Sequence, residues 1–190
     1  MLKNALRVLF TSIILLAAQV QADSSVQVLL TTDHGDIKLE LYPDKAPVTV
    51  ENFINYVNGK HYDGLIFHRV MKGFVIQAGG FKDDLTRREP SGKAIVNESF
   101  NGLSNTKGTI AMARQTDPDS AKAQFYINMA DNWTLNPRNG KPGYTVFGKI
   151  IQGTNVADKI SRQPITSMGP FANLPETPIH IIKAQVIGNE

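Results

Sequence analysis

Arg69 and Gln77 stand out because a guanidinium and an amide are embedded among apolar, strand-forming residues. Arg69 lies in the segment FHRV at residues 67–70, and Gln77 lies in GFVIQAGG at residues 73–80. A guanidinium keeps its charge and presents a rigid array of donors, while an amide both donates and accepts hydrogen bonds. Such a pair could bind a polar ligand. A lone arginine could instead form an ion pair at a sheet edge, so the neighbouring motifs must decide.

Other kinds of active site lack the residues that they need. The chain has no cysteine, which excludes disulfides, thiolate metal ligands and cysteine nucleophiles. No serine lies in a G-x-S-x-G elbow, and no glycine pattern of the G-x-G-x-x-G or Walker type occurs. The four histidines are His34, His61, His68 and His180. No two of them have the spacing of metal ligands with a third ligand nearby. We therefore expect a site that uses neither a metal nor a cofactor.

The first 22 residues have the pattern of a secretory signal peptide. Lys3 and Arg7 precede an apolar run at residues 8–18, and small residues at 20–22 precede a polar segment. The run is shorter than the roughly 20 residues that a membrane-spanning helix needs. We predict cleavage after Ala22, which leaves a mature domain of residues 23–190 with no membrane contact after cleavage.

The composition is that of one ordinary globular domain. Hydrophobic residues make up 42% of the chain and charged residues 19%, and no internal repeat or linker is visible. Removal of Lys3 and Arg7 would lower the number of basic residues from 20 to 18, against 17 acidic residues. A nearly neutral mature chain gives no support to a nucleic-acid partner.

Short apolar segments separated by glycine predict a mainly β domain. Residues 26–32 and 36–41 alternate around a turn, which predicts a hairpin. Further strands are expected at 65–71, 74–78, 109–113, 124–129, 145–151 and 179–187. In the first of these, alternation predicts Phe67, Arg69 and Met71 on one face. Long polar connections, of the kind that often carry function, lie at 82–94, 115–122 and 132–143.

Two helices are expected among these strands. Pro47 can begin a helix in which apolar residues recur at helical spacing, and Gly59 can end it. Residues 154–161 have a smaller apolar face, and Thr154 is a candidate N-cap for this second helix.

Several of the strand segments together resemble the cyclophilin family. The signature blocks of that family have counterparts in FHR at 67–69, GFVIQ at 73–77, GTIAMA at 108–113, AQFYI at 123–127 and VFGK at 146–149. The similarity extends from about Val26 to the C-terminus in the expected order. It is closest to the bacterial periplasmic branch, which shares the run from Asn101 to Arg114.

The resemblance implies a closed antiparallel barrel of eight strands, capped by two helices, for residues 23–190. It implies peptidyl-prolyl cis/trans isomerase activity on proline-containing polypeptides, and with it assistance to the folding of exported proteins in the periplasm. A monomer is expected.

Site residues follow from the resemblance position by position. Arg69 would be the catalytic arginine. The proline pocket would be lined by Phe74, Met112, Tyr126 and Leu135, and the substrate backbone would be held by Gln77, Ala113, Arg114 and Gln124. The expected substrate-binding set is completed by Val75 and Tyr144, which stand where many relatives carry methionine and, in eukaryotes, histidine.

The pocket and the substrate loop depart from the family pattern in two places. Relatives often carry an aromatic residue immediately before the leucine matched by Leu135, whereas Thr134 stands there and Trp133 comes one residue earlier. Trp133 is therefore either a shifted substitute or a plain surface aromatic. Tyr126 replaces a pocket phenylalanine, and its hydroxyl is expected at the rim.

Two other classes of function remain open from the sequence. A non-catalytic chaperone could use the same groove to hold proline-containing peptides. A lipocalin-like ligand barrel is a weaker alternative, because Arg69 and Phe74 fall in motifs that such carriers do not need. Catalysis is favoured because Arg69 and Phe74 occur together with Gln77, Met112 and Gln124.

Overall fold

The computed structural model describes residues 25–188, so the predicted signal peptide and its cleavage point lie outside the described residues. The described chain begins with the predicted hairpin, strands β1 (Val26–Thr32) and β2 (Gly35–Leu41). Alternate residues of both strands are fully buried, among them Leu30 and Leu39. The tight turn between the strands ends at Gly35, whose φ of +125° disfavours a side chain.

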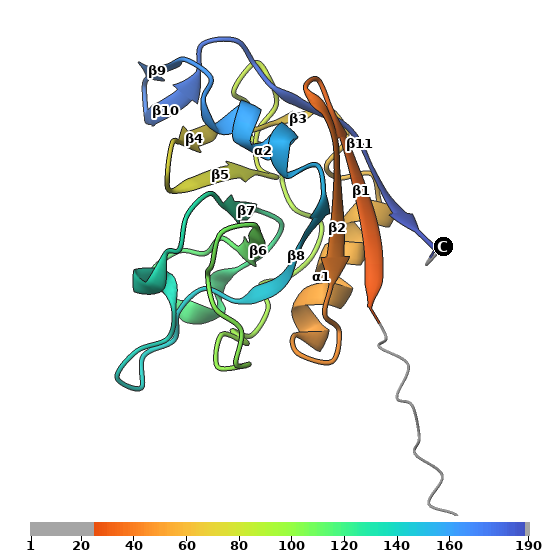
Figure 1. Cartoon of the computed structure of the whole chain (residues 1–190), viewed down its shortest axis with the longest axis vertical. Helices are drawn as coiled ribbons and strands as arrows, with labels where there is room; N and C mark the ends of the chain where they lie inside the picture. The colour runs from red at the N-terminus through yellow and green to blue at the C-terminus, as the bar shows by residue number, and fades with distance from the viewer. Residues whose placement is uncertain (1–24, 189–190) are drawn as a thin grey trace, which may run out of the picture.

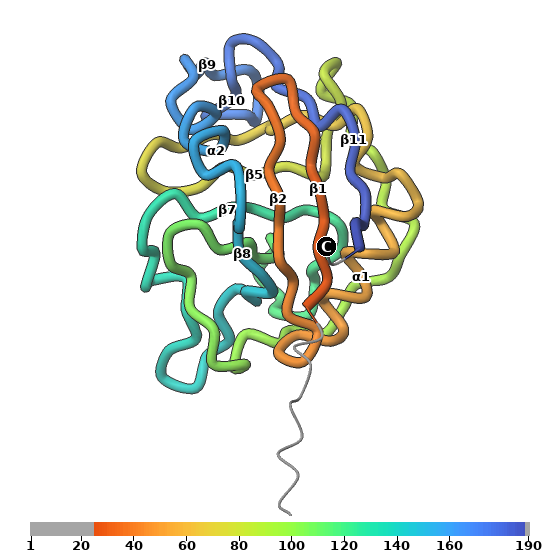
Figure 2. The backbone as a smooth tube through the Cα atoms, turned by 45° about the vertical axis from the view of Figure 1, so that its right-hand side comes forward, coloured from red at the N-terminus to blue at the C-terminus, as the bar shows by residue number. Residues whose placement is uncertain are grey.

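Nine of the eleven described strands form one curled antiparallel sheet, in the order β3-β11-β1-β2-β8-β6-β7-β5-β4 (Figure 1). The remaining strands of this sheet are β3 (Leu65–Ile66), β4 (Arg69–Met71), β5 (Val75–Ala78), β6 (Thr109–Met112), β7 (Phe125–Asn128), β8 (Val146–Gln152) and β11 (His180–Ile187). Figure 2 shows β1 between β2 and β11. The mainly β class is confirmed. The predicted strand segments are also present, with ends that differ by at most one residue, except that the segment 65–71 is divided into β3 and β4.

The expectation of a closed barrel with eight strands is wrong in detail. The two edges of the nine-stranded sheet are β3 and β4, and no ladder of hydrogen bonds joins them. They are consecutive in sequence, so Phe67 and His68 alone connect the edges. This break also overturns the predicted common face: Phe67 packs in the core together with Val70, whereas Arg69 is only partly buried.

Both predicted helices are present, α1 (Pro47–Asn58) and α2 (Thr154–Ser161). Glu98 caps α1 from a distant loop, because its carboxylate accepts the N–H groups of Val48 (3.1 Å) and Thr49 (2.8 Å). The expectation that Thr154 caps α2 is wrong. The N-cap is Gly153, whose φ is +88° and which packs against the carbonyl oxygen of Asp36, where a side chain would collide.

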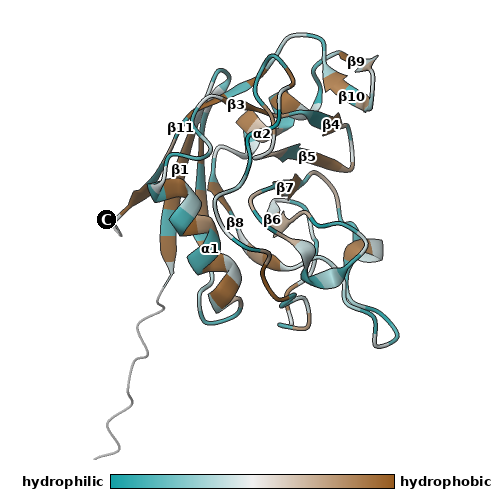
Figure 3. Cartoon of the chain, turned by 180° about the vertical axis from the view of Figure 1, so that it is seen from behind, coloured by the Kyte–Doolittle hydropathy of each residue, from teal (hydrophilic) through white to brown (hydrophobic). Residues whose placement is uncertain are grey.

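The main core lies between the curled sheet and α1. Phe53 of α1 sits at its centre, with ring centroids 5.1 Å from Tyr62, 5.5 Å from Phe125 and 5.2 Å from Phe147. Apolar and polar residues are mixed along α1, as expected for a helix with one buried face (Figure 3). None of the helices within residues 25–188 is both long and apolar enough to cross a membrane.

A second hairpin was not predicted from the sequence. Its strands are β9 (Ile165–Met168) and β10 (Phe171–Pro175), and every residue of β9 is exposed. The hairpin packs beside β4 through Phe171, whose ring centroid lies 4.9 Å from that of Phe81. Two short 3-10 turns, η1 (Pro118–Ser120) and η2 (Trp133–Leu135), lie in the predicted long connections.

Candidate active site

Arg69 and Gln77 are direct partners across the β4–β5 ladder. Arg69 Nη1 donates to Gln77 Oε1 (3.3 Å), and Gln77 Nε2 donates to Gln124 Oε1 (2.9 Å). Gln124 can pack this closely because Gly80 has no side chain: a Cβ there would lie 2.5 Å from Gln124 Nε2. The three side chains therefore form a hydrogen-bonded row on the outer surface of the sheet.

A cavity of about 220 Å³ opens beside this row and is called here the first cavity. Its apolar walls belong to a small cluster separate from the main core, which includes Phe74, Val75, Tyr126, Leu135 and Tyr144. The guanidinium carbon of Arg69 lies 5.8 Å from the centroid of the Phe74 ring. Nine of the eleven predicted site residues line the first cavity: Arg69, Phe74, Val75, Gln77, Ala113, Arg114, Tyr126, Leu135 and Tyr144.

Met112 is a correction to the predicted site. It is 2% exposed and belongs to the main core cluster, so it does not line the first cavity. Its neighbour Ala111 faces the small apolar cluster instead. The cause is strand alternation: two successive residues of β6 point to opposite faces of the sheet.

The hydroxyl of Tyr126 points away from the rim, contrary to expectation. It donates to Asn105 Oδ1 (2.7 Å), and Asn105 is fully buried. Asn128 Nδ2 donates to the same oxygen (3.1 Å), and Asn132 Nδ2 donates to Asn128 Oδ1 (2.7 Å). Burial raises the pKa of Tyr126. This network fixes the ring of Tyr126 as a wall of the cavity.

Arg114 braces the loop at residues 142–144. Its Nε donates to Gly143 O (3.1 Å), Nη2 to Pro142 O (3.1 Å) and Nη1 to Gln115 O (2.8 Å). Its guanidinium carbon lies 4.6 Å from the centroid of the Tyr144 ring. The donors of Arg114 are thus directed at protein carbonyls, so the side chain shapes the wall that carries Tyr144.

The two open interpretations of Trp133 are resolved by its position in η2. Leu135, at the end of η2, lines the first cavity, whereas Trp133 is 58% exposed and does not line it. Trp133 is therefore a surface aromatic and not a shifted pocket residue.

His68 lies directly behind Arg69 and is only 5% exposed. Burial lowers its pKa from 6.5 to about 4, with a smaller contribution from the positive charge of Arg69. The ring packs against Phe81, with centroids 4.7 Å apart. His68 is therefore neutral at physiological pH, and its ring packs among aromatic rings directly before the strand that carries Arg69.

A second cavity, of about 350 Å³, adjoins the first and was not predicted from the sequence. The two cavities share Gln77, Ala113 and Arg114, and Gln124 lines the second cavity only. Its outer wall is formed by residues 87–90, the segment RREP, within one of the predicted long connections. The only available signal was the pair of adjacent arginines in a loop.

A family model described as cyclophilin type peptidyl-prolyl cis-trans isomerase/CLD matches residues 27–186. This chain belongs to the cyclophilin family. The cyclophilin is 48% identical over 166 residues to "Peptidyl-prolyl cis-trans isomerase A" of Dickeya dadantii, and the match covers 87% of each protein. It is 44% identical over 173 residues to "Peptidyl-prolyl cis-trans isomerase" of Acinetobacter baylyi, covering 91% of this chain and 90% of that protein.

A solved structure agrees with this assignment. The crystal structure of a cyclophilin type peptidyl-prolyl cis-trans isomerase from Cryptosporidium parvum matches with a TM-score of 0.73 and 25% identity, and the match covers 87% of this chain and 99% of that one. The fold is therefore that of cyclophilins, and the lipocalin-like alternative is wrong. The activity is peptidyl-prolyl cis/trans isomerisation.

Proposed function

We propose that this cyclophilin isomerises X-Pro bonds of exported proteins and thereby assists their folding, with Arg69 as the catalytic residue. The observation that carries the proposal is the position of Arg69 above the apolar first cavity. Its Nη1 is oriented by Gln77 Oε1, and the other guanidinium donors remain for a substrate.

The proposed reaction needs no nucleophile, acid or base from Arg69, because rotation about an X-Pro bond breaks no covalent bond. Rotation about an X-Pro bond is slow because twisting the amide loses its resonance, with a barrier of roughly 18–20 kcal/mol. In the twisted state the proline nitrogen regains its lone pair and can accept a hydrogen bond. A fixed cation aimed at this nitrogen binds the twisted state more tightly than either planar isomer. A barrier lowered by about 7 kcal/mol corresponds to an acceleration of about 10⁵-fold.

The first cavity can hold the proline ring in place while the X-Pro bond rotates. Phe74, Tyr126 and Leu135 offer apolar surface to the pyrrolidine ring, and the buried network beneath Tyr126 keeps that surface rigid. With the ring held there, Gln77 and the backbone around Ala113 can bind the neighbouring peptide units, so rotation is confined to one bond.

Export to the periplasm is part of the proposal. It is supported by the order of basic, apolar and small residues in the first 22 positions and by the likeness to the bacterial periplasmic branch at residues 101–114. We propose that the mature protein acts as a monomer. The alternative of a binder without catalysis would use the same cavity and would not need Arg69.

The test compares the mature protein with Arg69→Ala in an exchange NMR measurement of X-Pro isomerisation in a short neutral peptide. We expect the variant to lose about 10²–10³-fold in kcat/KM, the scale of removing one donor to a developing charge. Arg162→Ala, at the end of α2, removes a comparable exposed charge and should leave the rate unchanged. If Arg69→Ala keeps its fold and the wild-type rate, Arg69 is not catalytic and the binding-only alternative gains.

A further inference from the structure

The second cavity is rich in positive charge. Among the described residues that line it are four cationic side chains, Arg87, Arg88, Arg114 and Lys122, against a single carboxylate, Glu89. The pair between Arg87 Nε and Glu89 Oε1 (3.4 Å) is exposed on both sides and is therefore weakly held. The cavity thus has more cations than anions to balance them.

Two of these arginines are satisfied by hydrogen bonds that leave their charge uncompensated. Arg88 Nη1 donates to the carbonyl oxygens of His61 (2.8 Å) and Asp63 (2.7 Å). Arg114 likewise donates to carbonyl oxygens, as described above. Carbonyls are neutral, so both guanidinium groups are fixed in place with their full positive charge. The positive charge of Arg88 also acts on His61: burial lowers the pKa of this histidine, and the charge of Arg88 lowers it further.

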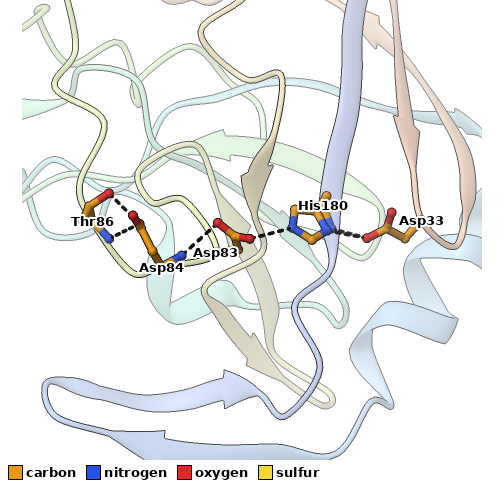
Figure 4. A network of polar contacts seen from close by, with 5 residues as sticks. All are labelled: Asp33, Asp83, Asp84, Thr86 and His180. Carbon is orange, nitrogen blue, oxygen red and sulfur yellow. Dashed lines mark hydrogen bonds and ion pairs between the residues drawn. The ribbon is translucent and has the colours of Figure 1, made fainter.

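The acidic residues of the same loop are engaged elsewhere. Asp83 Oδ2 lies 3.9 Å from His180 Nε2, and His180 Nδ1 lies 2.8 Å from Asp33 Oδ2 (Figure 4). Asp84 Oδ1 accepts the N–H (2.9 Å) and the hydroxyl (2.6 Å) of Thr86. The Asp84 contacts lie within the loop, only the exposed contact of Asp83 reaches β11, and neither aspartate lines the second cavity.

The position of the second cavity links its charge to the reaction. It shares Gln77, Ala113 and Arg114 with the first cavity, so a peptide whose proline occupied the first cavity would place a nearby side chain in the second. We propose that the second cavity binds an acidic side chain of the substrate, so that this cyclophilin prefers X-Pro bonds flanked by aspartate or glutamate. The inference rests on the proposed function only in placing the proline in the first cavity.

The experiment uses peptides that are identical except for one position near the proline. Glutamate, glutamine or lysine is placed in turn at each flanking position, and kcat/KM is measured by exchange NMR with the mature protein. At one position we expect the glutamate peptide to exceed the glutamine peptide by about three- to fivefold at low salt, the scale of charge pairs near a surface. The lysine peptide should fall below both, and added salt should reduce the differences.

Two variants separate the cavity from the overall charge of the protein. Lys122→Glu places a carboxylate at the rim of the second cavity, whereas Lys183→Glu makes the same change of charge on β11. Lys122→Glu should abolish the glutamate preference, and Lys183→Glu should preserve it. The inference is overturned if no position favours glutamate, or if the two variants act alike.

The glutamine peptide keeps this test independent of the proposed function. If it is accelerated but no charge preference appears, only the second cavity has been misinterpreted. If it is not accelerated at all, the proposed role of the first cavity fails, and binding of the glutamate peptide is then measured directly by NMR titration. Binding that is tighter than for glutamine and lost in Lys122→Glu would still support the acidic site, and equal binding would overturn it.

Discussion

The first and second cavities adjoin but are built from different parts of the fold. The first cavity rests on the β4–β5–β7 ladder, and a buried network through Tyr126 and Asn105 backs its wall. The outer wall of the second cavity is a loop, anchored by Arg88 to two backbone carbonyls. Strand ladders fix the groups that need exact geometry, while a loop can change its charges without disturbing them.

The two cavities also differ in the interactions that they can form with a substrate. The first offers apolar surface and one oriented guanidinium, which suit a ring and a twisted amide. The second offers fixed charge, which suits selection among substrates. We therefore assign the rate of isomerisation to the first cavity and the preference among substrates to the second.

The largest expected effect is on acid stability, at the buried His68 next to Arg69 in the chain. Its ring contacts Phe81, which bridges to Arg87 in the loop of the second cavity. Because burial lowers the pKa of His68 from 6.5 to about 4, the unfolded chain binds this proton more readily than the folded one. Stability should therefore fall as the pH is lowered from about 6.5 to about 4, by up to about 3 kcal/mol from this group.

Denaturant unfolding across that pH range, for the wild type and for His68→Gln, measures the contribution. The variant should lose less stability on acidification than the wild type, whatever its stability at neutral pH. Parallel curves for the two proteins would show that protonation of His68 is not opposed by burial.

The next largest effect is expected at Gln77, which lines both cavities and orients Arg69. Gln77→Leu removes the acceptor for Arg69 Nη1, and a misplaced catalytic group costs about 10- to 100-fold. kcat/KM on a neutral peptide should fall by that factor. Gln152→Leu, at the exposed end of β8, is the matched control. A loss below about threefold would mean that Arg69 is oriented without Gln77.

A smaller effect is expected at Tyr126, in the wall of the first cavity. Tyr126→Phe removes the hydrogen bond to Asn105 Oδ1, which still accepts from Asn128. The free energy of unfolding should decrease by about 1 kcal/mol, the net value of one such bond, and activity should stay within about twofold. Unchanged stability together with a raised KM would place the hydroxyl at the substrate instead.

The smallest effect is expected from pH on catalysis. The proposed mechanism uses no group that changes its protonation state near neutrality, and His68, next to Arg69, titrates near pH 4. kcat/KM on a neutral peptide should vary by less than about twofold between about pH 6 and about pH 8. A bell-shaped profile centred near neutrality would reveal a general acid or base in the first cavity.

The sequence predicted those parts of the fold in which one face is buried. β1, β2 and α1 have clean alternation or helical spacing, because each packs one face on the core. The β9–β10 hairpin could not be predicted, because β9 is exposed along its whole length and has no apolar period. The cap that Glu98 places on α1 was invisible for another reason: the partners are some 50 residues apart.

Within the site, the motifs predicted which residues gather but not always how they face. Met112 occurs in a signature block, yet the alternation of β6 turns it into the core. Arg114 lines both cavities as predicted, and the sequence did not show that its guanidinium also braces the loop that carries Tyr144. The second cavity arises where residues 87–90 meet residues 113–124, and pairing between loops leaves no periodic signal.

We propose that Arg69 accelerates rotation about the X-Pro bond and does not merely hold the substrate. Exchange NMR at saturating neutral peptide measures the dissociation constant and the on-enzyme exchange rate separately for Arg69→Ala. We predict a dissociation constant within about threefold of wild type and an on-enzyme rate lower by about 10²–10³-fold. A weakened dissociation constant with an unchanged on-enzyme rate would contradict the account, because it would make Arg69 a binding residue only.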